Sequence, residues 1–334
     1  MPKNVIFGAG PLGLAVARRL ISSGKDVRVI NRSGRAIGLA GVEVFAADAS
    51  DPEAARRACE GAGAVFHCAT HSYGQWAKVL PPIMNGIIEG AAAAGARLVY
   101  GDNLYAYGPV DGPIREDLPY RPVGPNTRAR AEVATTLMNA HASGKVRATI
   151  GRASDFYGPY ARQSKAGDSI FARALAGKPA QVLGDPDEPH TLTYIDDFAS
   201  ALVTLSQQDT ALGEVWHVPN PETVTLREFI EMVFEQLARP PRLQPVPKIA
   251  ITLMSLVVPS MAGVKETMYQ SERSWVVDHS KYLRAFGGQP TPHEAAIART
   301  IAWYRNADDT DKVGGGAGGG GAGGGGAGGG GAGI

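Results

Sequence analysis

The chain has 334 residues, of which 44% are hydrophobic and 19% charged, and its formal net charge is +1. This composition predicts a globular protein with a substantial core, and the balanced charge argues against a nucleic-acid binder, which needs a basic surface. Two cysteines without metal-ligand spacing, Cys59 and Cys68, exclude a disulfide framework and favour a reducing compartment.

Strands and helices alternate along the first half of the chain. Short apolar runs predict strands, and stretches of helix formers between them predict helices. The expected strands are 4–7, 27–30, 42–45, 64–68, 97–100 and 146–150, and the expected helices are 12–21, 51–60, 79–94 and 127–141. The alternation predicts an α/β fold with a doubly wound parallel sheet of the Rossmann type, which binds ligands at the carboxyl ends of its strands.

A glycine-rich turn follows the first predicted strand and opens the first predicted helix. Residues 8–13 read GAGPLG, a GxGxxG motif in the context that this motif requires. The first two glycines allow a tight turn and close backbone approach, and the third lets the helix pack on the strand. We therefore expect the pyrophosphate of a dinucleotide at the N-terminus of this helix, bound by Gly8, Gly10, Pro11, Leu12 and Gly13.

The end of the second predicted strand distinguishes NADP from NAD. An NAD site usually places a carboxylate there for the ribose 2′-hydroxyl, but residues 31–35 read NRSGR and contain no acid. Arg32 can pair with a 2′-phosphate and stack on adenine, while Asn31, Ser33 and Arg35 can add hydrogen-bond donors. We therefore predict NADP(H) as the cofactor.

Four further segments extend the pattern beyond the glycine turn. They are Ala47-Asp48, VFHCA at 65–69, RASDFYGP at 152–159 and YIDD at 194–197. With them, residues 3–305 resemble the extended short-chain dehydrogenase/reductases, also called the NAD-dependent epimerase/dehydratase family. The resemblance implies that Asp48, Cys68 and Ala69 lie against the adenosine half of the cofactor and that Tyr157 lies near the nicotinamide.

The chain departs from the family pattern at the glycines and at the catalytic positions. Extended members usually carry GxxGxxG, with a catalytic tyrosine and lysine four residues apart at the start of a helix. Matching that helix by its Ala-Glu pair, 131–132, places Asn126 at the tyrosine position and Arg130 at the lysine position. Asn103 takes the place of the catalytic hydroxyl residue. The resemblance therefore implies an atypical member.

These replacements change the acid–base chemistry. Hydride transfer to a carbonyl needs a group that stabilises the developing alkoxide and a group that protonates it. Asn126 can donate a hydrogen bond but no proton, and Arg130 stays protonated. We expect Asn103 and Asn126 to bind the polar atom of the substrate and Arg130 to orient the nicotinamide ribose.

Two residues are candidates for the proton donor. Tyr105 lies on the loop past the fifth predicted strand, where the family has a small residue. Asp155 stands where the family often has asparagine, and burial there would raise the pKa of its carboxyl group so that it could act as an acid. Tyr107 and Tyr157 match family positions that are usually explained by packing or by a cofactor contact.

The segment after the fourth predicted strand corresponds to the substrate loop of the family. It carries His71, Ser72, Tyr73 and Trp76, whose aromatic side chains indicate either an apolar substrate wall or a helix entry packed on the core. His190 is a further candidate substrate contact, or a structural histidine. The histidine spacings do not predict a metal site.

The pattern loosens after residue 152, where prolines and loops become frequent. We expect a mainly NADP-binding Rossmann domain over 1–152 and a smaller substrate lobe over 153–310 that also returns pieces to the sheet. The uncharged, largely apolar stretch 249–264 is shorter than the roughly 20 apolar residues of a membrane span and favours a buried helix or a substrate lid. The glycine–alanine region 311–334 is expected to be a flexible, artificial tail.

Together these features predict an NADPH-dependent reductase of a small, largely apolar carbonyl, enone or imine. The alternatives are a protein that binds the cofactor without turnover and a sugar-nucleotide epimerase or dehydratase, which needs a strong base that Asn126 does not supply. Because the chain opens without a secretory signal, we expect a cytoplasmic protein with no membrane or nucleic-acid partner. The resemblance also allows a homodimer.

Overall fold

A computed structural model describes residues 2–35, 37–71, 74–247, 249, 252 and 259–314. Ser72 and Tyr73 of the expected substrate loop therefore lie outside the described residues. The same is true of half of the uncharged stretch 249–264 and of the whole tail after residue 314.

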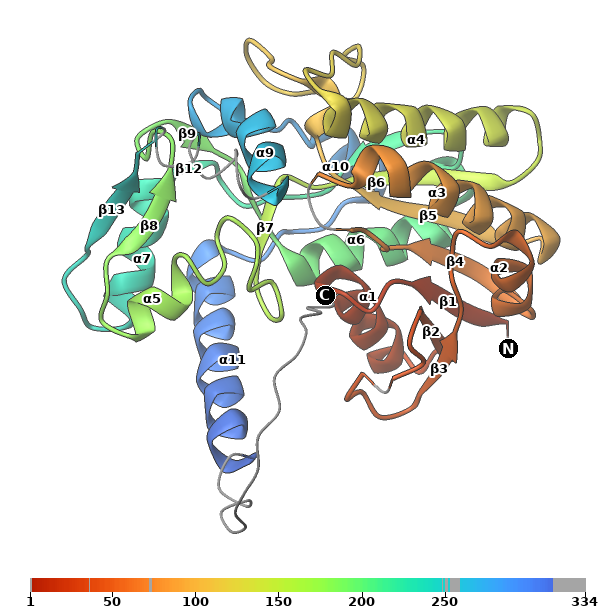
Figure 1. The fold of residues 1–334 in the computed structure, drawn as a ribbon, viewed down its shortest axis with the longest axis horizontal. Coiled ribbons are helices and arrows are strands. Elements are labelled where there is room, and N and C mark those ends of the chain that lie inside the picture. The colour runs from red at the N-terminus through yellow and green to blue at the C-terminus, as the bar shows by residue number, and fades with distance from the viewer. Residues whose placement is uncertain are drawn as a thin grey trace, which may run out of the picture.

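Seven parallel strands form the central sheet, in the order β11-β6-β5-β4-β1-β2-β3 (Figure 1). Their bounds are β1 Lys3–Phe7, β2 Val27–Asn31, β3 Val42–Ala46, β4 Ala62–His67, β5 Arg97–Asp102, β6 Arg147–Arg152 and β11 Val215–His217. The predicted α/β fold with a doubly wound parallel sheet is confirmed. The strand order reverses between β1 and β4, which is where such folds bind their ligands.

Helices cover both faces of the sheet. On one face lie α2 (Pro52–Ala58), α3 (Trp76–Ala93) and α4 (Pro125–Ala142), and on the other lie α1 (Pro11–Ser22) and α6 (Ile195–Gln207) (Figure 1). Glycines in α3 let it approach α2 closely. A Cβ atom on Gly90 would lie only 2.6 Å from the carbonyl oxygen of Ala55.

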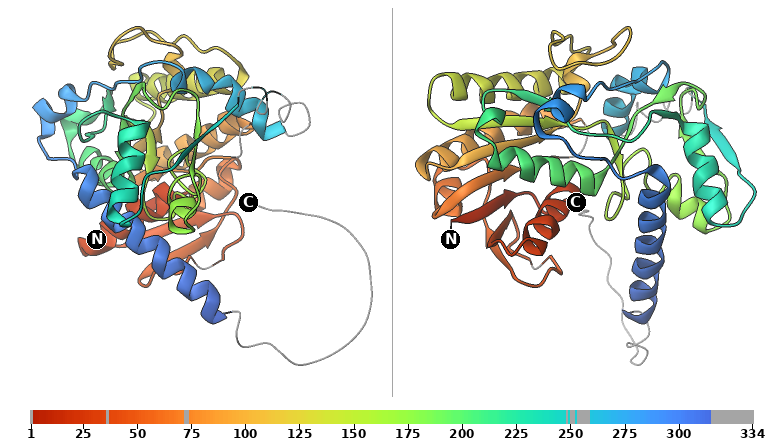
Figure 2. Two further views of the ribbon diagram at one scale, coloured as in Figure 1. Left: turned by 90° about the vertical axis from the view of Figure 1, so that its left-hand side faces the viewer. Right: turned by 180° about the vertical axis from the view of Figure 1, so that it is seen from behind.

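The second half of the chain forms a smaller lobe and also completes the sheet. Its strand pairs are β7 (Asp155–Tyr157) with β10 (Leu192–Tyr194), β8 (Ala180–Leu183) with β13 (Leu243–Val246), and β9 (Pro189–His190) with β12 (Val224–Thr225). Its helices are α5 (Phe171–Leu175), α7 (Leu226–Gln236), α9 (Pro259–Glu266), α10 (Ser280–Phe286) and α11 (His293–Gly314). Figure 2 shows α11 beside α5 and α7. Aromatic and aliphatic side chains of these helices belong to a separate core.

Two pieces of this second half return to the first. Strand β11 pairs with β6 at the edge of the sheet, and α6 packs along α1. The guanidinium group of Arg18 on α1 donates a hydrogen bond of 2.8 Å to Asp196 on α6. The division of the chain at residue 152 into two domains stays a prediction. In the ranges that the structure describes, no helix is both long and apolar enough to cross a membrane.

Candidate functional site

The glycine turn joins β1 to α1 at the carboxyl edge of the sheet. Gly8 adopts a φ of +108°, and a Cβ atom there would lie 2.7 Å from the backbone nitrogen of Ala69. A Cβ atom on Gly13 would lie 1.9 Å from the carbonyl oxygen of Gly8. The fold itself therefore needs both glycines, one for the turn and one for helix packing.

Gly10 differs from these two glycines. It is the N-cap residue of α1, has a φ of −78°, and a Cβ atom there would meet no atom within 4 Å. No side chain caps this helix end and no acidic residue lies in its first turn, so its positive end is not neutralised from within α1. The open space above Gly10 fits the close approach of a pyrophosphate group.

The turn after β2 is closed by its own polar side chains. Asn31 donates to the carbonyl oxygen of Arg35 at 3.0 Å, and Ser33 donates to Asn31 at 3.2 Å. Arg32 and Arg35 are exposed, and neither guanidinium group forms an ion pair with any residue that the structure describes. The turn therefore presents two exposed positive charges.

Asp48 lies close to this turn, in the segment that follows β3. Its carboxylate accepts hydrogen bonds from the backbone nitrogen of Ser50 at 2.9 Å and from the Ser50 hydroxyl at 2.7 Å. These bonds, and then the charge of Arg32, hold the pKa of Asp48 below its usual value. Asp48 is thus an ionised, exposed acceptor beside the predicted adenosine site.

The segment that follows β4 lies against the glycine turn. Cys68 is buried, and its backbone nitrogen donates to the carbonyl oxygen of Phe7 at 2.9 Å. The backbone of Ala69 lies against Gly8, where it fills the position that a Cβ atom would need. The structure therefore brings together the glycine turn and the VFHCA segment, which are separated in the sequence.

Arg130 is buried where β4 and β5 end. It donates hydrogen bonds to the Tyr100 hydroxyl at 2.8 Å, to the Thr70 hydroxyl at 3.1 Å and to Asp102 at 3.4 Å. Its guanidinium group also stacks 4.2 Å above the ring of Trp76. Arg130 therefore places a buried positive charge at this edge of the sheet, where neighbouring side chains accept its hydrogen bonds. Its role in orienting the nicotinamide ribose stays a prediction.

Trp76 and Tyr105 form an aromatic stack beside Arg130. Their ring centroids are 5.9 Å apart, and both side chains are almost fully buried. Trp76 begins α3 and donates to the carbonyl oxygen of His71 at 2.6 Å. For Trp76, the structure favours the interpretation as a helix entry packed on the core. Asn103 accepts the backbone N–H of Tyr105 at 3.1 Å.

Asn126 lies in the first turn of α4 and contacts a residue that sequence reasoning missed. Its side-chain nitrogen donates to the carboxylate of Glu266, on α9, at 2.9 Å. No spacing or motif in the sequence points to Glu266, because the two residues are 140 positions apart.

Asp155 corrects one of our expectations. Although burial raises the pKa of its carboxyl group, the charge of Lys165 and the hydrogen bonds from Lys165 and His190 have the larger combined effect, and the net pKa is lowered. Lys165 and His190 both lie 3.0 Å from Asp155 Oδ2. The prediction of a raised pKa is therefore wrong, and Asp155 is an ionised carboxylate rather than a proton donor. His190 is buried and paired with it, as expected of a structural histidine.

Tyr157 lies in the core of the smaller lobe. Its side chain is fully buried in the core of the smaller lobe, and its hydroxyl lies 3.1 Å from His293 Nδ1. The ring packs against Phe171 and Phe229. These contacts account for the side chain by packing, and its place near the nicotinamide stays a prediction.

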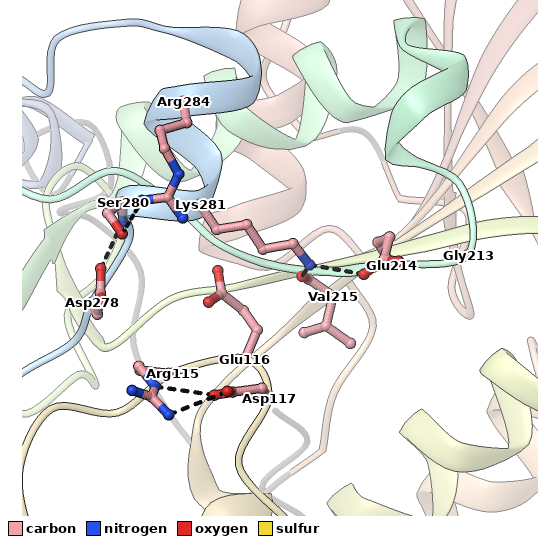
Figure 3. A pocket seen from close by; sticks show the side chains of 10 residues that line it. All are labelled: Arg115, Glu116, Asp117, Gly213, Glu214, Val215, Asp278, Ser280, Lys281 and Arg284. Atoms are coloured by element: carbon pink, nitrogen blue, oxygen red, sulfur yellow. Dashed lines mark hydrogen bonds and ion pairs between the residues drawn. The ribbon is translucent and has the colours of Figure 1, made fainter.

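A charged cavity of about 520 Å³ opens beside β11, away from the predicted residues (Figure 3). Arg115 pairs with Asp117 at 3.1 Å, and Lys281 pairs with Glu214 at 2.8 Å. The cavity is lined by Arg115, Glu116, Asp117, Gly213, Glu214, Val215, Asp278, Ser280, Lys281 and Arg284. None of the residues predicted for the site lines it, and its opposite charges are largely paired with each other.

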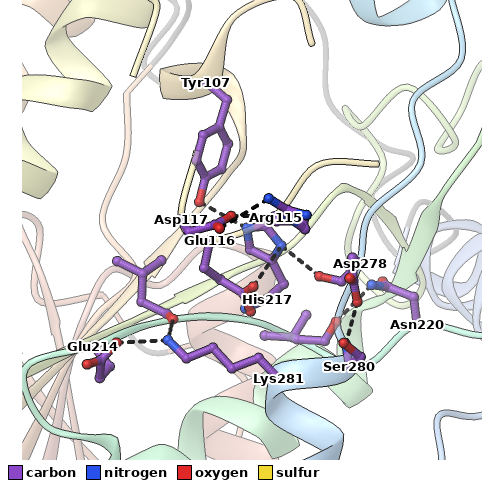
Figure 4. A network of polar contacts seen from close by, with 12 residues as sticks. Tyr107, Arg115, Glu116, Asp117, Glu214, His217, Asn220, Asp278, Ser280 and Lys281 are labelled. Atoms are coloured by element: carbon purple, nitrogen blue, oxygen red, sulfur yellow. Dashed lines mark hydrogen bonds and ion pairs between the residues drawn. The ribbon is translucent and has the colours of Figure 1, made fainter. Parts of the chain in front are cut away.

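A polar network centred on His217 adjoins this cavity (Figure 4). His217 Nδ1 lies 2.9 Å from the carbonyl oxygen of Asp278, so it carries the proton, and Nε2 accepts the Tyr107 hydroxyl at 3.0 Å. Burial lowers the pKa of His217 to about 3. Arg152 stacks 4.8 Å above Tyr107 and donates to Asp102. This network thus explains Tyr107 by packing and hydrogen bonding.

The sequence of this chain is similar to those of a dehydratase and a reductase. A dTDP-glucose 4,6-dehydratase of Xanthomonas campestris is 24% identical over 205 residues, which cover 61% of this chain and 55% of that protein. A 2-alkyl-3-oxoalkanoate reductase of Stenotrophomonas maltophilia is 26% identical over 257 residues, covering 71% and 76%. The chain thus spans little more than half the length of the dehydratase.

Solved structures share the fold. The UDP-glucose 4-epimerase of Thermus thermophilus, in complex with NAD, superposes with a TM-score of 0.72 at 23% identity, over 91% of this chain and 99% of that one. A family model described as the NAD dependent epimerase/dehydratase family matches residues 5–218. Because this match runs from β1 to the end of the central sheet and takes in more than half of the chain, we conclude that the protein belongs to the NAD dependent epimerase/dehydratase family.

Proposed function

We propose that this protein is an NADPH-dependent reductase of a small, largely apolar carbonyl, enone or imine substrate. The observation that carries the proposal is the turn after β2, where Arg32 and Arg35 are exposed and no acid takes the ribose position. Two exposed guanidinium groups attract a 2′-phosphate, whereas a carboxylate would repel it. Similarity to a reductase of Stenotrophomonas maltophilia supports the reaction class.

The glycine turn fits a dinucleotide. The space over Gly10 is open, and the uncapped N-terminus of α1 suits a pyrophosphate. Asp48 would contact the adenosine half, and Arg32 with Arg35 would hold the 2′-phosphate. When bound, the reduced nicotinamide supplies a hydride to the substrate.

A buried charge past β4 and β5 supports the reduction of a carbonyl group. Trp76 and Tyr105 form an aromatic stack at this edge of the sheet, and the buried charge of Arg130 lies against it. A positive charge at this place stabilises the negative charge that develops on a carbonyl oxygen during reduction. With Asp155 ionised, Tyr105 is the proton donor that remains of our two candidates.

The test is the oxidation of NADPH and of NADH by the purified protein against a panel of ketones, enones and imines. The wild type is expected to prefer NADPH, and Arg32→Ala to lower that preference by about tenfold or more, because a charge-assisted hydrogen bond is lost. Arg19→Ala, an exposed arginine on α1, is the matched control. Tighter binding of NADH, or an unchanged preference in Arg32→Ala, would contradict the proposal.

A second candidate is a protein that binds the cofactor without turnover. The hydrogen bonds of Arg130 to the hydroxyl groups of Tyr100 and Thr70 favour this function, because they occupy a guanidinium group that would otherwise contact the cofactor. Bound NADPH that is never oxidised by any member of the panel would select this function. Tight binding of a nucleotide-diphosphate sugar would instead select an epimerase or dehydratase.

A further inference from the structure

The carboxylate of Glu266 lies at the N-terminus of α4. Its Oε1 accepts the backbone N–H of Thr127 at 2.7 Å, and its Oε2 accepts the backbone N–H of Asn126 at 3.2 Å. Oε2 also accepts the Asn126 side-chain amide at 2.9 Å. A half-buried carboxylate from α9 is therefore bound by three N–H donors of α4.

The loop before α4 is shaped to admit this carboxylate. A Cβ atom on Gly124 would lie 2.4 Å from the carboxyl carbon of Glu266. The Thr127 hydroxyl closes the loop by accepting the backbone N–H groups of Val123 and Gly124 at 3.0 Å. A glycine in extended backbone, with φ of −161°, is thus explained by the approach of Glu266.

Glu266 determines which way the Asn126 amide faces. A carboxylate has only acceptors, so the nitrogen and not the oxygen of this amide must point toward it. Asn126 is buried, yet its Oδ1 and its second side-chain N–H have no partner among the residues that the structure describes. One N–H of the Asn126 amide is therefore bonded to Glu266, and the second N–H is available to a ligand.

The same face of α4 carries Arg130. Asn126 precedes Arg130 by four residues, so the two side chains lie on one face about one turn, 5.4 Å, apart. Arg130 bonds to Thr70 and Asp102, which mark the carboxyl edge of the sheet beside β4 and β5. Asn126 is thus on the helix face that looks onto the edge where the substrate is expected.

We propose that Glu266 is a positioning residue that holds the Asn126 amide so that its second N–H donates to the oxygen of the substrate. This inference rests on the proposed reductase function and deepens it. Glu266 takes no part as a proton source, because both of its oxygens accept hydrogen bonds from α4. Without Glu266, the side-chain amide of Asn126 can flip and present its oxygen to the negative charge that develops on the substrate oxygen.

The kinetic test is a double-mutant cycle on the purified protein with a turned-over carbonyl substrate and NADPH. We expect Glu266→Ala and Asn126→Ala each to lower kcat by about tenfold or more, as the loss of an oriented oxyanion donor does. The double variant should equal Asn126→Ala alone, because Glu266 acts through Asn126. Glu132→Gln, an exposed glutamate on α4, is the control for the loss of charge.

A structural readout keeps the inference testable without turnover. In ¹⁵N NMR spectra, the side-chain amide of Asn126, assigned by its absence in Asn126→Ala, should exchange slowly with solvent in the wild type. In Glu266→Gln it should exchange faster, because the glutamine presents an N–H group to N–H donors. Thermal unfolding of each variant verifies that it is folded.

The two proposals fail in different ways. If the wild type reduces no substrate, the proposed reductase function is wrong. The NMR result still decides whether Glu266 holds the Asn126 amide. Additive losses of kcat in the double variant overturn the positioning role even when the reductase is active. An unchanged exchange rate of the Asn126 amide in Glu266→Gln overturns it as well.

Discussion

Gly10 and Gly13 belong to one motif, yet their missing side chains serve different purposes. A Cβ atom on Gly13 would overlap the backbone of Gly8, whereas one on Gly10 would meet no atom of the protein. We expect Gly13→Ala to lower the free energy of unfolding by about 1–3 kcal/mol through overpacking. Gly10→Ala should leave that free energy unchanged and weaken NADPH binding.

Urea unfolding and calorimetric titration with NADPH, applied to both variants, separate these two effects. An equal loss of stability in the two variants would show that the space over Gly10 is not open. Full NADPH affinity in Gly10→Ala would show that the dinucleotide does not approach this residue.

Asp155 shows why burial of a single residue is a poor guide to its charge. Desolvation raises the pKa of a carboxyl group, but a nearby cation and hydrogen bonds to the charged form can outweigh it. Here Lys165 and His190 both contact one oxygen of Asp155, and the carboxylate is the stable form. The sequence allows the burial of Asp155 to be expected, but not the side chains that Asp155 contacts.

At the scale of elements, α6 joins the two halves of the chain. Leu202 is fully buried, and Cβ atoms on Gly101 and Gly151 would lie 3.1 and 2.5 Å from its methyl groups. Glycines on two neighbouring strands thus make room for one side chain of α6. This contact seats the returning helix on the sheet.

We expect Leu202→Ala to lower the free energy of unfolding by about 2–5 kcal/mol, because the rigid strands cannot collapse into the cavity. Urea unfolding followed by circular dichroism measures the change. Leu212→Ala, at a half-buried turn, is the comparison and should cost less. Equal costs for the two variants would mean that α6 is not held by this contact.

At the scale of the whole molecule, buried neutral histidines make the fold sensitive to acid. Burial, and then the charge of Arg130, lowers the pKa of His67 from 6.5 to about 3, and burial lowers that of His217 to about 3. Between about pH 6.5 and about pH 3, these two histidines bind more protons in the unfolded chain than in the folded one. Stability from these two groups is therefore lost as the pH falls from about 6.5 toward about 3.

Each such histidine contributes up to about 1.4 kcal/mol of destabilisation per pH unit in this range. We expect His67→Phe, which keeps a ring against Tyr100, to lose less stability than the wild type between about pH 7 and about pH 5. Urea unfolding at both pH values checks this. The same loss in both proteins would show that His67 is not buried in its neutral form.

Local patterns in the sequence were enough to predict the order of strands and helices, the glycine turn and the acid-free turn after β2. This is because each depends on residues that are neighbours in the chain: periodicity sets an element, and glycine permits a turn. The parallel, doubly wound arrangement of the sheet then followed from the α/β alternation. The six strands predicted in the first half agree with the structure to within a few residues.

Only the tertiary structure decided what surrounds the chemical groups. Glu266 meets Asn126 across 140 residues, Lys165 and His190 meet Asp155 from other segments, and β11 reaches β6 from the second half of the chain. A pKa, an amide orientation or the burial of Tyr157 depends on such distant contacts, because electrostatic fields and packing act through space and not along the chain.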